Sequence, residues 1–148
     1  MASIRDTLLT TLVTRINAIS GITCVLRSRS NTVSDAVMAI VYPDSEDTHL
    51  ANAYAYNASL RCEVLLIVRA EDADPSLDAS NEYRYLDRML VAVQKVIHTP
   101  DSWGVSPAFT DVEMTGHVVE DPSEENEMMA RLSINFTYSH NYQDPESA

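Results

Sequence analysis

The chain has 148 residues, of which 45% are apolar, and it carries a formal net charge of −12. That apolar content lies well above the range of disordered chains, and the length suits one domain with a substantial core. The acidic surplus argues against non-specific binding to nucleic acid or to an anionic membrane.

The charge is unevenly distributed. Residues 1–34 carry four arginines against one aspartate, whereas residues 101–148 carry one arginine against ten carboxylates. No apolar run approaches the ~18 residues of a membrane span, and the N-terminal stretch shows no signal-peptide pattern, so a cytoplasmic product without membrane contact is expected. Cys24 and Cys62 fall in separate predicted strands. A disulfide between them is possible in principle, but a reducing cytoplasm favours two buried thiols.

The first predicted element is a helix over residues 4–19. Ser3 is a plausible N-cap and Gly21 suits the helix end. Apolar residues at steps of four form its buried stripe: Ile4, Leu8, Leu12 and Ile16. A short strand over 22–27, a polar loop over 28–35 and an apolar strand over 36–42 follow, and Pro43 is expected to end that strand.

Residues 44–52 are acidic and predict a loop. The following alternation predicts a long strand from Tyr54 to Arg69, apolar on both faces in its second half and central to the sheet. Its first half places Tyr54 and Tyr56 on one face. Two interpretations stay open for these side chains: a half-buried edge extension, or an aromatic contact surface.

Residues 71–79 form a predicted acidic loop. Asp72 and Asp74 resemble part of a calcium loop, but no later Gly and Glu stand at the required spacing, so a solvated loop is favoured. A second helix, capped by Ser80, is predicted from its apolar stripe: Tyr83, Leu86, Leu90, Val93 and Ile97. Pro100 ends it, and Trp103 falls in the next turn.

Strands over 109–119 and 128–138, joined by a turn over 121–126, predict a C-terminal hairpin. The order α-β-β-β-α-β-β predicts an α+β fold: a single-layer mixed or antiparallel β-sheet with two helices packed on one face and a C-terminal β-hairpin. We expect one domain over residues 1–142 and a flexible tail over 143–148.

Little in the sequence points to catalysis. Three glycines and two cysteines offer neither a phosphate loop nor a zinc site. His117 with Glu113 or Glu120 has the composition of an acid–base pair but lacks a nucleophile, and His140 is expected in polar surroundings. We therefore expect no catalytic, cofactor-binding or metal-binding residues, no cofactor and no enzyme activity.

The order of elements resembles the tail terminator proteins of long-tailed bacteriophages, of the lambda type. The resemblance covers nearly the whole chain and has no catalytic motif. The matching pieces, in chain order, are Val37–Tyr42, Asp44–Asp47, Cys62–Val68, Asp72–Asp78, the helix through Leu86 and Leu90, and Ala130–Tyr138.

The resemblance implies a structural virion protein that forms a homohexameric ring. Such a ring caps the tail tube protein, ends tube polymerisation and joins the tail to head-completion or neck proteins. DNA passes through the lumen without specific binding, and the protein, assembled in the host cytoplasm, ends in the virion. The alternatives are a related tail-tube or head–tail connector protein and, less favoured, a small α+β enzyme or ligand-binding domain.

Three sets of residues follow as candidates. Subunit pairing is predicted between basic and acidic side chains of neighbouring copies: Arg27 and Arg29 with Glu124, Glu125 and Glu127. Contact with the tube or a neighbour is predicted for Asp44, Glu46, Asp47, Tyr54 and Tyr56. Channel lining is predicted for Glu71, Asp72, Asp74, Glu120 and Asp121, although plain solubility explains an acidic surface equally well.

Overall fold

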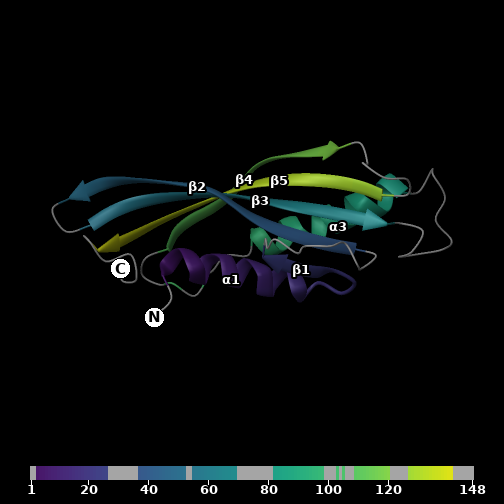
Figure 1. Ribbon diagram of the computed structural model, residues 1–148, viewed down its shortest axis with the longest axis horizontal. Helices are drawn as coiled ribbons and strands as arrows, with labels where there is room; N and C mark the ends of the chain where they lie inside the picture. Colours follow the sequence, from purple (N-terminus) through teal and green to yellow (C-terminus); the bar gives the residue numbers. More distant parts are fainter. Residues whose placement is uncertain are drawn as a thin grey trace.

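The computed structural model describes residues 3–26, 37–52, 55–69, 82–98, 103, 105, 109–120 and 127–141 (Figure 1). Within these ranges the elements are α1 (Ile4–Asn17), β1 (Thr23–Leu26), β2 (Val37–Asn52), β3 (Ala55–Arg69), α3 (Glu82–Ile97), β4 (Phe109–Glu120) and β5 (Glu127–Asn141). This order confirms the α-β-β-β-α-β-β prediction.

The strands form one mixed sheet in the order β1-β2-β3-β5-β4. β1 runs parallel to β2, and the other neighbouring pairs are antiparallel, including the predicted β4–β5 hairpin. β3 is the central strand and pairs along its length with both β2 and β5. Both helices lie on one face of the sheet, which confirms the α+β prediction (Figure 1).

The core lies between this face and the helices. Ser3 caps α1 as predicted, because its side chain accepts a hydrogen bond from the Asp6 backbone N–H at 3.0 Å. The stripes of the two helices are buried: Ile4, Leu8, Leu12 and Ile16 of α1, and Leu86, Leu90, Val93 and Ile97 of α3. They pack on alternate residues of β3 and β5, as the strand periodicity predicts.

Trp103 lies in a turn, as predicted, and its side chain belongs to this core, which the sequence did not indicate. Its side chain has no exposed surface, and its ring meets Phe136 edge-on with 5.0 Å between centroids. The Arg15 guanidinium lies 4.1 Å from the centre of the same ring. An isolated aromatic residue in a polar stretch carries no periodicity, so only the tertiary contacts reveal its burial.

Two sequence predictions about β2 were wrong, namely its end at Pro43 and the loop over 44–52, because the strand continues to Asn52. β1 pairs only with Met38–Val41, so beyond Val41 the described part of β2 is an edge on that side. Proline is tolerated on such an edge because its missing N–H deprives no neighbouring strand of a donor. β3 supplies the pairing on the other side through to Asn52, with a bulge at Asp44.

The outer edge of β1 is closed by a side chain of α1. The Asn17 amide donates to the Cys24 carbonyl at 2.9 Å and accepts from the Cys24 N–H at 2.7 Å. This contact occupies the backbone groups through which another strand would pair. Cys24 and Cys62 are buried free thiols, as predicted, and burial raises the pKa of each to about 12.

Candidate interaction surfaces

The paired far ends of β2 and β3, residues 45–52 and 55–59, form a feature that we call the distal hairpin. Figure 1 shows these ends reaching past the first turn of α1. The bulge at Asp44 sets which side chains face the helices there, since Pro43 pairs with Cys62 but Ser45 pairs with Arg61. One extra residue reverses the alternation and brings Glu46 to the helix side.

Glu46 is consequently engaged within the chain. Its carboxylate lies 3.3 Å from the Arg5 guanidinium on α1 and accepts a hydrogen bond from the Tyr138 hydroxyl on β5. Burial, reinforced by this carboxylate, raises the pKa of Tyr138. Glu46 therefore couples the distal hairpin to the domain, whereas Asp44 and Asp47 are exposed and accessible to a partner.

A row of three side chains crosses the distal hairpin on the helix side of the sheet. Leu50 pairs with Tyr56, and Tyr56 pairs with His140. Leu50 is 56% exposed, and the rings of Tyr56 and His140 stack with 5.5 Å between centroids. Tyr56 is half-buried while Leu50 beside it is open, so the row has an anchored end and an accessible end.

The expectation of polar surroundings for His140 was wrong. Only 8% of it is exposed, and it lies between Tyr56 and Tyr138, whose ring centroid is 6.2 Å away. The alternation of β5 simply continues two residues beyond Tyr138, which places His140 on the covered face.

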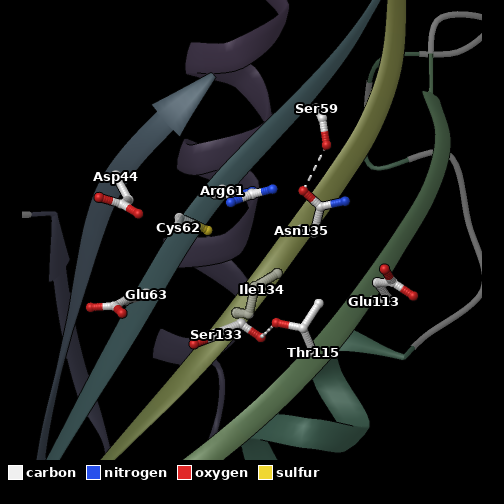
Figure 2. Close-up of a pocket in the computed structure, with 10 residues that line it drawn as sticks. All are labelled: Asp44, Ser59, Arg61, Cys62, Glu63, Glu113, Thr115, Ser133, Ile134 and Asn135. Atoms are coloured by element: carbon white, nitrogen blue, oxygen red, sulfur yellow. Dashed lines mark hydrogen bonds between the residues drawn. The ribbon is translucent and has the colours of Figure 1, made fainter. Parts of the chain in front are cut away.

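The opposite, helix-free face of the sheet carries a polar concavity of about 450 Å³, here called the sheet groove (Figure 2). Its lining comes from four strands: Asp44, Ser59, Arg61, Cys62, Glu63, Glu113, Thr115, Ser133, Ile134 and Asn135. Ser59 donates a hydrogen bond to the Asn135 side-chain oxygen at 2.8 Å, and Thr115 donates to the Ser133 carbonyl at 3.3 Å. These bonds fix the hydroxyl groups of Ser59 and Thr115.

The charges of the sheet groove alternate across the strands. Arg61 of β3 pairs in register with Asn135 of β5, which pairs with Glu113 of β4. Figure 2 shows Asp44 on the other side of Arg61.

A second recess, of about 350 Å³, adjoins the groove and shares Asp44 and Glu63 with it. Arg131 and Glu63 form an ion pair at 3.3 Å on one wall of this recess. Tyr42, Pro43 and Leu65 supply its apolar surface. A partner that fits here therefore meets apolar contact beside a band of mixed charge.

Several predicted site residues lie outside the described part of the chain: Arg27, Arg29, Tyr54, Glu71, Asp72, Asp74, Asp121, Glu124 and Glu125. Glu120 and Glu127 belong to β4 and β5, but their side chains also lie outside it. The same holds for the predicted tail over 143–148. The pairing of Arg27 and Arg29 with acidic residues and the acidic channel lining thus stay predictions.

Across the described ranges, no His, Cys, Asp and Glu side chains gather in a group of three or more that could hold a metal ion. Neither of the described helices is long and apolar enough to cross a membrane. Comparison with protein-family models and with curated proteins finds no match for this chain.

Proposed function

We propose that this chain is a structural virion protein of the tail-terminator type. Six copies form a ring that caps the tail tube of a long-tailed phage, ends tube polymerisation and provides the joint to head-completion proteins. The observation that supports this most is the distal hairpin, a strand pair that extends past α1 and carries an exposed Leu50 beside a half-buried Tyr56.

The distal hairpin is suited to side-chain contact with the tube or a neighbouring subunit. Leu50 and Tyr56 offer an aliphatic and an aromatic group, and aromatic groups are enriched at protein interfaces. Pro43 and the bulge at Asp44 interrupt the backbone edge of β2 nearby, which disfavours indiscriminate strand pairing. Contact through specific side chains fits a terminator, because such a protein must bind the end of the tail tube without serving as a template for further polymerisation.

The acidic balance fits a ring through which DNA passes. Carboxylates in a lumen repel the phosphate backbone, whereas a basic lumen binds it through counterion release. With a net charge of −12 on each copy, the carboxylates left over after subunit pairing line the channel. The candidates are those of the predicted acidic loops, Glu71, Asp72, Asp74, Glu120 and Asp121.

The test combines the purified chain with polymerising tail-tube subunits from the same phage. Native mass spectrometry and negative-stain images should show a six-membered ring, alone or at tube ends. A chain that neither forms rings nor attaches to tubes would contradict the proposal.

The length of the distal hairpin favours one second candidate, a tail-tube subunit. Tube subunits stack ring on ring through a long projecting segment, and β2 and β3 extend further than a modest loop between short strands. The two candidates differ in self-association. A tube subunit polymerises into long tubes by itself, whereas a terminator stays a single ring.

A further inference from the structure

We infer that the outer face of α3 in one copy docks into the sheet groove of the next copy. This inference rests on the proposed ring and names the surfaces that close it. Both surfaces lie within the described residues, and Ser59 is the one residue of the distal hairpin that lines the groove.

The outer face of α3 is a basic stripe centred on an exposed valine. Its members follow at steps of four, three and four residues and share one helix face: Arg84, Arg88, Val91 and Lys95. All four are exposed, and Val91 is 40% exposed although it is apolar. Asp87 is the one acidic residue among them. The stripe lies opposite the face of α3 that packs in the core.

The other cations whose side chains are described are spread over different elements. Arg5 on α1 is paired with Glu46, and Arg131 on β5 is paired with Glu63. Arg15 lies over Trp103, and within the stripe Arg88 lies over Tyr85 at 5.4 Å from the ring centre. Arg61 lies within the sheet groove itself. The basic stripe of α3 therefore concentrates three of the ten lysines and arginines of the chain on one side of one helix.

The sheet groove and its adjoining recess complement this stripe. Asp44, Glu63 and Glu113 supply three carboxylates against two arginines, and the Arg131–Glu63 ion pair leaves Asp44 and Glu113 facing Arg61 alone. The recess offers Tyr42, Pro43 and Leu65 as apolar contacts for Val91. An exposed apolar residue within a basic stripe thus meets an apolar recess beside a band of mixed charge in which carboxylates outnumber arginines.

The dimensions agree as well. Asp44 on β2 and Glu113 on β4 are three strand spacings apart, or about 14 Å. Eleven residues of helix separate Arg84 from Lys95, a rise of about 16 Å. An α3 that crosses the strands therefore reaches Glu113 with Arg84 and Asp44 with Lys95, and Val91 falls at the recess.

This contact joins different copies. α3 packs on β4 and β5 from the helix side, whereas the sheet groove opens on the helix-free face of the same sheet. The two surfaces of one copy cannot meet because the sheet lies between them. A contact between unlike surfaces of identical chains is heterologous, and such contacts close into rings when the rotation permits.

Site-directed cross-linking tests the contact directly. Cys24 and Cys62 are buried and the pKa of each is raised to about 12, so they do not compete with a cysteine introduced at the surface. Protein carrying V91C is mixed with protein carrying P43C, and a short bifunctional maleimide should give cross-linked dimers. T14C, on the exposed surface of α1, replaces V91C as the matched control.

Charge reversal supplies the second arm. R84E with R88E, or D44R with E113R, should each lower the V91C–P43C yield at least tenfold, and the combined charge swap should restore much of it. A V91C–P43C yield no higher than that of T14C would overturn the inference, as would folded reversal variants that cross-link like the parent. Rings or tube caps that persist in either case would show that the proposed function stands and that other surfaces close the ring.

Discussion

The two ends of the β2–β3 pair share one hydrogen-bonded ladder but differ in what covers them. At the near end, Val37, Val41 and Val64 are at most 2% exposed, and Met38 and Ile67 on the other face are buried too. At the distal hairpin, Leu50 is 56% exposed and Asp47 is open to solvent. The backbone pairing is continuous along the two strands, so it does not distinguish the ends. The difference is that neighbouring side chains bury the near end, whereas the distal hairpin is open to solvent. Stability should therefore depend on the near end and its cover, and recognition on the distal hairpin.

The largest effect on folding is expected from the cover of the sheet. Trp103→Ala should lower the free energy of unfolding by about 3–5 kcal/mol, because it removes a fully buried ring from Phe136 and Arg15. Leu50→Ala, at the distal hairpin, should change it by less than about 0.5 kcal/mol. Denaturant unfolding of both variants measures the contrast, and equal losses would remove the distinction between the two ends.

Alkaline pH should weaken the core through the buried thiols. The folded-state pKa of Cys24 and of Cys62 is about 12, above the ordinary 9.0, so each thiol keeps its proton in the folded protein and loses it on unfolding. The stabilisation that the two thiols give the folded state is fully present below pH 9. As the pH rises from 9 toward 12, the free energy of unfolding falls by up to about 1.4 kcal/mol per pH unit for each thiol. Tyr138, whose pKa is also raised, adds to the loss at the upper end of this range.

Denaturant midpoints measured between pH 8 and 11 test this dependence. Cys62→Val removes one titrating group while keeping an apolar side chain, so its profile should be flatter than that of the parent. A parent chain with constant stability across this range would contradict the burial of the thiols.

Substitution of Glu46, which joins the distal hairpin to α1 and β5, should have an intermediate effect on the free energy of unfolding. Glu46→Ala leaves the buried Tyr138 hydroxyl without its acceptor and should cost about 1–3 kcal/mol. Tyr138→Phe in the same chain should recover part of that loss, because the unsatisfied hydroxyl is removed with its partner. Arg5→Ala, which breaks a partly exposed ion pair, should cost less than about 1 kcal/mol. Additive losses for the two changes Glu46→Ala and Tyr138→Phe would show that Glu46 does not couple the hairpin to β5.

The sequence predicted the near end better than the distal hairpin. Apolar stripes such as Leu8, Leu12 and Ile16 predict a helix, because burial of one helix face requires apolar residues at a period of about 3.6. Pro43 and the acidic residues after it carry the composition of a loop, and only pairing with β3 makes them a strand. The bulge at Asp44 escapes prediction since its place depends on a cross-strand register. The sheet groove escapes it for the same reason, because Asp44, Arg61 and Glu113 converge only through pairing.

Substitution of the exposed Leu50 is expected to have the smallest effect on the stability of the fold and the largest effect on binding to the tail tube. Leu50→Asp should leave the unfolding midpoint nearly unchanged while it weakens attachment to tube ends at least tenfold, because it adds a charge to an exposed apolar contact. Thr10→Asp, an equal charge change on the exposed surface of α1, serves as the control. Co-sedimentation with assembled tubes measures attachment, and equal binding by the two variants would place the tube contact elsewhere.

The distribution of tube lengths tests the proposed function most directly. Tail-tube subunits polymerise with and without the purified chain, and electron micrographs record the length and both ends of each tube. A terminator should shorten the tubes in proportion to its concentration and leave one ring at the capped end. Tube lengths that do not respond to the chain, or tubes built from the chain itself, would contradict the account.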